Sequence, residues 1–100
     1  MSKGYLIAHL KEHDKEGMEK FKQMSGPTIG EHGGKVLVRE PSPDVREGEN
    51  LGTVVLIEFP NKEKALGWYN SDEHQKIVVQ RRKATDPKST IVICEESDSY

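Results

Sequence analysis

Four short stretches of the chain are apolar or alternate between apolar and polar residues, as β-strands do. They are 5–10, Lys35–Glu40, Thr53–Phe59 and 89–95. Thr53–Phe59 favours a strand most strongly, because nearly all of its residues are β-branched or apolar. Pro60 follows directly and predicts that this strand ends there, since proline cannot donate to a sheet ladder.

Apolar residues recur at helical spacing between the first two strands. Asp14 precedes them and is a residue type that caps helix N-termini. Gly26-Pro27 predicts an interruption of this helix, with Pro27 at the first position of a short second segment. Gly33-Gly34 predicts the end of that segment.

A second helical region follows Thr53–Phe59, with Asn61 as its predicted cap. Asn70-Ser71 predicts a break, after which Ser71 caps another helix. Ile77, Val78 and Arg81 continue the buried stripe of that helix. The cations at 81–83 lie at its end, where they complement the helix dipole. The polar loop 41–52 is longer than a usual hairpin connection, and it fits a lid, a clasp on a partner or a mobile connection equally well.

The predicted order is strand, helix, strand, strand, helix, strand, which is the ferredoxin-like βαββαβ arrangement. It predicts an α+β fold in which helices cover one face of a four-stranded antiparallel sheet. The opposite face is also largely apolar, since Val54 and Leu56 alternate with the residues expected to face the helices. An uncovered apolar face needs a partner, and a second copy packed sheet against sheet is the simplest one.

The chain has 100 residues and a net charge of −2, which fits a single domain over 1–100 with a frayed tail at 96–100. It contains no run of about 20 apolar residues, so no membrane span is expected. A sequence pI of about 6.1 argues against nucleic-acid binding by bulk charge. Cys94 is the only cysteine, and the first apolar stretch is too short for a signal peptide. These features favour a cytoplasmic protein.

Candidate chemistry lies on the predicted open sheet face. His9, Arg39 and Glu58 are candidate catalytic residues, because they offer an acid–base group, an anion anchor and a carboxylate. The side chains of Tyr5, Leu37 and Leu56 are expected to line the same space. The alternative is structural: Arg39 and Glu58 pair at the rim, and His9 is an ordinary strand histidine.

A second candidate group lies in the region that follows Asn61. Trp68, Tyr69, Ser71 and His74 are candidate ligand-binding residues, with the aromatic pair as a wall and Ser71 as a hydroxyl. In the alternative interpretation Trp68 and Tyr69 pack the helix on the sheet, and Ser71 only caps the next helix. The histidines and Cys94 lack metal-ligand spacing, so neither a metal nor a cofactor is expected.

Several sequence blocks together resemble those of a known family. They are Gly4-Tyr5-Leu6-Ile7-Ala8, His32-Gly33-Gly34-Lys35, Leu37-Val38-Arg39, Val55-Leu56-Ile57-Glu58-Phe59-Pro60 and Trp68-Tyr69-Asn70-Ser71-Asp72-Glu73. The chain thereby resembles the dimeric α/β-barrel superfamily and, within it, the family catalogued as domain of unknown function 1330. The family usually has an aromatic residue where this chain has His74, and glycines where it has Glu40-Pro41.

The resemblance implies a homodimer with a cavity, and no settled activity. Superfamily relatives include cofactor-independent monooxygenases, isomerases and haem-handling enzymes, and by that analogy His74 is the histidine to test first for haem. We therefore expect a small-molecule-binding protein or a cofactor-independent monooxygenase- or isomerase-like enzyme, with its cavity between the sheets of a homodimer. The alternative is a non-enzymatic dimerising sensor or assembly module without an open site. RNA binding on the open sheet face fits least, because the central strands lack the necessary aromatic pattern.

Overall fold

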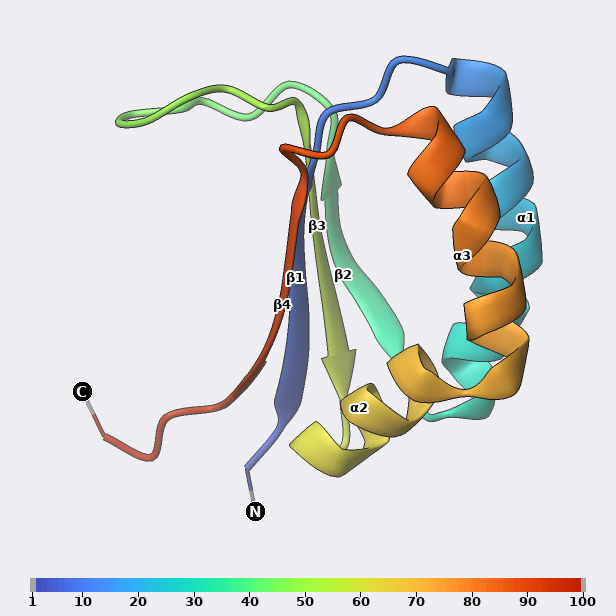
Figure 1. Cartoon of the computed structure of the whole chain (residues 1–100). Helices are drawn as coiled ribbons and strands as arrows, with labels where there is room; N and C mark the ends of the chain where they lie inside the picture. The colour runs from blue at the N-terminus through green and yellow to red at the C-terminus, as the bar shows by residue number, and fades with distance from the viewer. Residues whose placement is uncertain (1, 100) are drawn as a thin grey trace.

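A computed structural model describes residues 2–99 of the chain. The predicted βαββαβ order is confirmed, with the second helical region divided into two helices (Figure 1). The elements are β1 (Gly4–Leu10), α1 (Lys15–Glu31), β2 (Lys35–Glu40), β3 (Thr53–Phe59), α2 (Lys62–Asn70), α3 (Asp72–Ala84) and β4 (Thr90–Glu95).

The four strands form one antiparallel sheet in the order β2-β3-β1-β4. All three helices lie on the same side of this sheet, and the other face is uncovered (Figure 1). This is the predicted α+β ferredoxin-like fold. None of the helices in residues 2–99 is long and apolar enough to cross a lipid bilayer.

The core lies between the sheet and the helices and draws on alternate residues of the central strands. Every second residue of β1 and β3 is buried, because successive side chains of a strand point to opposite faces. Ala65 and Trp68 of α2 and Met18 of α1 close this core from the helix side. The buried set on the two strands consists of Leu6, Ala8, Leu10, Val55, Ile57 and Phe59.

Helix α1 corrects one prediction, because it continues through Pro27 to Glu31 without a break. Proline removes one backbone donor from a helix, which normally favours an interruption. Tertiary packing opposes this loss here: Thr28 is buried, and its hydroxyl accepts a hydrogen bond from the Trp68 indole nitrogen at 2.9 Å. The helix ends as predicted, with Gly33 at φ 78° and the Gly34 N–H donating to the Ile29 carbonyl at 2.8 Å.

The three predicted helix caps are confirmed. The Asp14 carboxylate accepts from the Gly17 N–H at 3.0 Å. The Asn61 side-chain oxygen caps α2 in the same way and accepts a hydrogen bond from the Lys64 N–H at 2.8 Å. The Ser71 hydroxyl accepts from the His74 N–H at 3.2 Å and donates to the Trp68 carbonyl at 2.8 Å. Ser71 therefore ends α2, begins α3 and sets the angle between them.

Strand β2 is exposed along its whole length, because no helix packs closely over it. Its register against β3 shifts between Val36 and Val38, so Leu37 is an extra residue in an irregular ladder. Val36 pairs with Ile57 and Arg39 pairs with Val55, whose side chains face the helices. The shift therefore turns Arg39 toward the helix side of the sheet.

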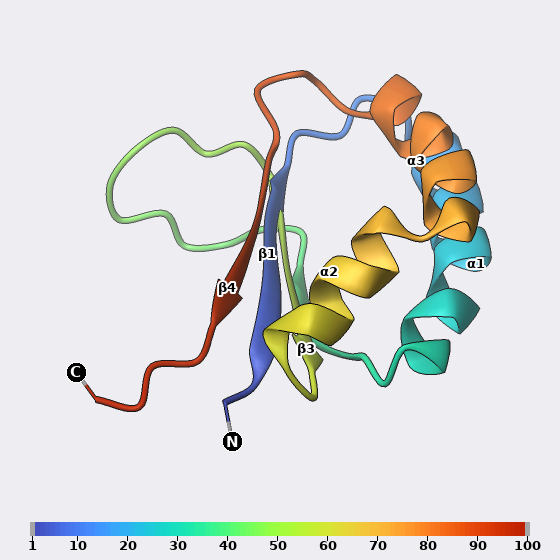
Figure 2. The ribbon, with the colours of Figure 1, turned by 60° about the horizontal axis from the view of Figure 1, so that its bottom comes forward.

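Loop 41–52 and the residues after β4 both leave the body of the domain on the side of the uncovered sheet face (Figures 1 and 2). Lys88 approaches Glu49 of this loop at 3.7 Å, and both side chains are exposed. Residues 96–99 contain no regular element, and the frayed tail at 96–100, whose last residue lies outside the described residues, stays a prediction.

Candidate functional site

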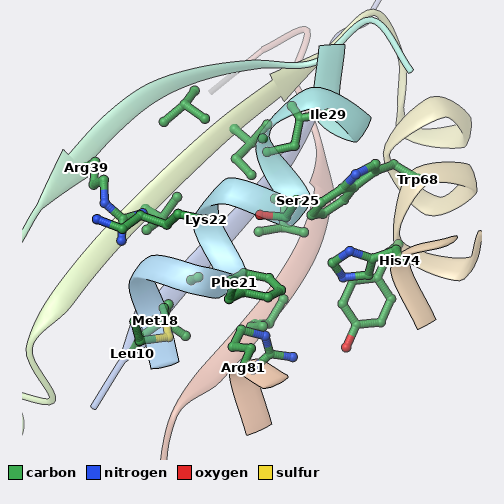
Figure 3. Close-up of a pocket in the computed structure, with 18 residues that line it drawn as sticks. Leu10, Met18, Phe21, Lys22, Ser25, Ile29, Arg39, Trp68, His74 and Arg81 are labelled. Atoms are coloured by element: carbon green, nitrogen blue, oxygen red, sulfur yellow. The ribbon is translucent and has the colours of Figure 1, made fainter. Parts of the chain in front are cut away.

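A cavity of about 320 Å³ lies between the helices and the sheet. Its walls come from all three helices and all four strands, and most of them are apolar (Figure 3). Its volume equals roughly ten water molecules at about 30 Å³ each. It is large enough for a small organic molecule, near the lower end of ligand pockets. The polar groups in its wall include Ser25, Tyr69, His74 and Arg81, together with Lys22 and Arg39 on the β2 side.

Small side chains create this space. Ala8 lies in the central strand β1, and Ser25 and Gly26 lie in α1, all three in the cavity wall. Helix α1 packs mainly on α3, whereas α2 contacts β1, β3 and β4. The helix layer thus approaches the sheet closely under α2 and leaves room under α1.

Arg81 is the most unusual residue of the site, because it is a buried cation without an acidic partner. The residue is 7% exposed, and no Asp or Glu between residues 2 and 99 lies within ion-pair distance of it. Burial lowers the pKa of Arg81, while a hydrogen-bonding contact with the Tyr69 side chain acts in the opposite direction. Arginine stays charged under these conditions, so the cavity wall carries a positive charge.

His74 lies beside it at the start of α3. Its ring centroid is 4.1 Å from that of Trp68, 5.2 Å from that of Tyr69 and 6.1 Å from that of Phe21. The residue is 1% exposed, and its Nδ1 atom has no hydrogen-bond partner. Burial, followed by the positive charges of Arg81 and Arg82, lowers the pKa of His74 to about 4. The imidazole is therefore neutral near pH 7.

Two further cationic side chains lie at the β2 side of the cavity (Figure 3). Lys22 pairs with Glu19 on the outer surface of α1 at 3.0 Å. Arg39 Nη2 lies 4.0 Å from Glu12 Oε2, a buried atom without a hydrogen-bond partner. These two cations are balanced by acids, whereas Arg81 is not.

The predicted catalytic group is not assembled. Arg39 lies on the helix side of the sheet because of the irregular register of β2, so it is separated from His9 and Glu58 on the uncovered face. His9 pairs with Val54 at one end of β1, while Glu58 pairs with Tyr5 at the other. The expectation that these three residues share one space is wrong.

Glu58 instead belongs to a small polar cluster on the uncovered face. The Tyr5 hydroxyl donates to Glu58 Oε2 at 3.2 Å, and Lys3 Nζ lies 3.4 Å from Oε1. Desolvation and this hydrogen bond raise the pKa of Tyr5, so its phenol stays protonated. Leu56 also lies on this face, and Leu37 is the extra residue of the β2 ladder, so neither contributes to the cavity wall.

Most of the second predicted group lies in the cavity wall. Trp68, Tyr69 and His74 line the cavity together, although their role in binding stays a prediction. Ser71 is not part of the cavity wall and acts as a helix cap. Arg81 is the residue that the site predictions missed. Arg81 lies on the apolar stripe of α3, and this position could have identified it as a candidate site residue, because burying a charge is costly.

The cavity lies on the face opposite to the predicted one. A space between two sheets needs the partner subunit, so that expectation stays a prediction for the assembly. Residues 2–99 contain no group of three His, Cys, Asp or Glu side chains that could hold a metal ion.

The βαββαβ order and the antiparallel sheet define a ferredoxin-like domain, which is the fold that the resemblance implied. The profile of the domain of unknown function family DUF1330 matches residues 3–95. The chain therefore belongs to DUF1330, which confirms the resemblance seen in the sequence. None of the curated proteins compared with the chain matches it.

Solved structures share the fold at low sequence identity. A protein of unknown function from Rhodopseudomonas palustris has a TM-score of 0.73 and 15% identity, with 97% of this chain and 84% of that chain covered. A candidate antibiotic biosynthesis monooxygenase from Nitrosomonas europaea has a TM-score of 0.61 and 17% identity, with 100% of both chains covered. A dimeric ferredoxin-like protein of unknown function from Bacteroides fragilis has a TM-score of 0.59 and 15% identity, with 94% and 95% covered.

Proposed function

We propose that the helix-side cavity binds a small, mostly apolar organic anion, and that Arg81 holds its negative group. The protein would then be a small-molecule-binding protein or a cofactor-independent enzyme. The observation that carries this proposal is the buried, acid-free Arg81 in the wall of an apolar cavity of about 320 Å³.

The physical argument is one of charge compensation. A buried cation without a partner is costly, and proteins usually compensate it with a carboxylate. The guanidinium group presents parallel N–H donors that match the two oxygens of a carboxylate. A bound organic acid would supply the missing anion, and the apolar walls would cover the rest of the molecule.

One comparison bears on whether the protein is an enzyme. The fold relative from Nitrosomonas europaea is described as a candidate monooxygenase, but its 17% identity supports the fold alone. The alternative, a dimerising module without an open site, is less favoured because the cavity is open in the single chain. The cytoplasmic location stays a prediction from the sequence.

Thermal stability with paired ligands tests the proposal. Hexanoate and benzoate should raise the melting temperature, while the uncharged hexanamide and benzamide should raise it much less. Arg81→Met should lose at least tenfold in affinity for the acids. Arg82→Met removes an exposed cation from the same helix and should bind like the parent. Equal shifts for acids and amides, or full affinity in Arg81→Met, would contradict the proposal.

We also propose that the uncovered sheet face joins two copies of the chain. Ile7 and Val92 are 40% and 49% exposed there, and they are direct neighbours on β1 and β4. Solved relatives of this fold are described as dimeric.

Ile7→Lys should yield monomers in sedimentation velocity, because a lysine would be buried in an apolar contact. Val79→Lys places the same charge on a helix surface, where Val79 is 48% exposed, and should remain dimeric. A monomeric parent protein at micromolar concentration would contradict the proposal.

A further inference from the structure

Besides the acid-free cation of Arg81, the cavity wall contains a buried group without a hydrogen-bond partner, and the two groups differ in chemistry. Arg81 is a cation that needs an anion, whereas the buried Nδ1 of His74 has no hydrogen-bond partner. Resting on the proposed function, we propose that the bound acid carries a ketone, and that His74 moves a proton between carbon and oxygen of that ketone. The activity would be keto–enol interconversion of an oxo acid.

The fold brings the necessary groups to one end of the cavity. His74 and Arg81 are seven residues apart on α3 and therefore share a helix face. The long Arg81 side chain leans toward the N-terminus of the helix, as side chains in helices do. Tyr69 enters from α2, with its ring centroid 5.2 Å from that of His74, and it lines the same cavity as Arg81.

Each group has a distinct hydrogen-bonding capacity. The Arg81 guanidinium has only donors. The Tyr69 O–H is a further donor in the same cavity wall, and it can donate to a ligand oxygen. The neutral His74 has one ring nitrogen that accepts a proton, and Nδ1 is the buried nitrogen without a partner. The end of the cavity therefore presents two donors for an oxygen and one acceptor for a proton.

The reaction needs no further reagent. His74 takes the proton from the carbon next to the ketone, and the electron pair of that C–H bond forms a carbon–carbon double bond. The carbonyl π electrons move to the oxygen, which Arg81 and Tyr69 stabilise as it becomes an enolate. The protonated His74 then returns the proton to the oxygen, which gives the enol, or to carbon. Nothing is oxidised or reduced.

The negative charge of the substrate has a defined role in this step. Protonated His74 would lie near the cation of Arg81, and the two charges repel each other in the empty cavity. A carboxylate bound to Arg81 cancels that repulsion and makes His74 a stronger base once the substrate is in place. The base is therefore weak without substrate and stronger with it.

Deuterium exchange measures this step directly. 2-Oxobutanoate, 2-oxohexanoate and phenylpyruvate serve as probes in D₂O, and NMR follows the loss of the proton signal on the carbon next to the ketone. We expect exchange at least tenfold faster than in buffer for at least one probe. His74→Gln should lose at least tenfold of the enzymatic rate while the probe still raises its melting temperature. His13→Gln removes an exposed histidine outside the cavity and should exchange like the parent.

The outcomes separate this proposal from the one on which it rests. If a 2-oxo acid binds without faster exchange, or if His74→Gln keeps the parent rate, the role of His74 is refuted and anion binding stands. If simple carboxylates bind but no 2-oxo acid does, the substrate class is refuted. If no acid binds, the proposed function itself fails. His74→Asn provides a second variant in case glutamine prevents folding.

Discussion

Replacing His74 with glutamine should flatten the pH dependence of the unfolding free energy between pH 7 and pH 5. The folded protein holds the pKa of His74 at about 4, compared with an ordinary value of 6.5. Between these values the unfolded chain binds a proton that the folded protein does not. Stability therefore increases with pH across this range and is lost as the pH falls from about 6.5 toward 4.

The magnitude follows from the two pKa values. One pKa unit corresponds to about 1.4 kcal/mol, and linkage between values of 6.5 and about 4 gives a loss of about 2 kcal/mol from pH 7 to pH 5. The near-complete burial of the ring supports an effect of this size, since solvent screens it little. In a small domain this is a substantial part of a total stability of about 5–15 kcal/mol.

Urea denaturation at pH 7, 6 and 5 measures the effect. Circular dichroism is the preferred signal, because the Trp68 ring lies against His74 and its fluorescence would respond to the substitution itself. The difference in stability between the parent and His74→Gln should shift by about 2 kcal/mol over this range. Parallel slopes for the parent and His74→Gln would refute the assignment of a buried neutral imidazole.

Substitutions at three further positions test side-chain packing and helix capping by urea denaturation at pH 7. Trp68→Phe should cost about 2 kcal/mol, because it removes the indole donor to the buried Thr28 hydroxyl, and a neutral result would contradict this hydrogen bond. Gly34→Ala should cost about 1–3 kcal/mol, since its Cβ would lie 2.6 Å from Ile29 Cγ2 and 2.7 Å from Phe59 Cε1; an unchanged stability would show that this contact relaxes freely. Asp14→Ala should cost about 1 kcal/mol through loss of the α1 cap, whereas Asp14→Asn should lose much less, and equal costs would contradict capping.

The fold was accessible from the sequence because local and global signals agree. Alternation along β3 predicts which of its residues face the helices, and the structure buries those residues. Asp14, Asn61 and Ser71 mark helix starts through short-range hydrogen bonds that depend on neighbours in the chain alone. Pro27 shows the limit of local signals, since the cost of a proline in a helix is opposed by contacts with a distant helix.

The site was only partly accessible, for two physical reasons. Strict alternation puts Arg39 on the face of Leu37, but a register irregularity in β2 turns it to the other face, and such irregularities leave no period in the sequence. Arg81 was visible as part of an apolar stripe, yet an arginine near a helix end is also explained by the helix dipole. Only the three-dimensional surroundings, which bury Arg81 without an acid nearby, distinguish it from a surface charge.

The cavity supports the proposed function, because a core selected for stability alone would fill it. Protein interiors pack as densely as organic crystals, and empty apolar space costs stability in proportion to its volume. Ala8 occupies the centre of the most central pair of strands, where a larger aliphatic residue would be expected to reach α1. Ser25 and Gly26 lie on the helix side of the same space and are small as well. Small residues on both walls, together with a buried cation and an unpaired imidazole nitrogen between them, are what a ligand-binding space requires and what a stabilising core would exclude.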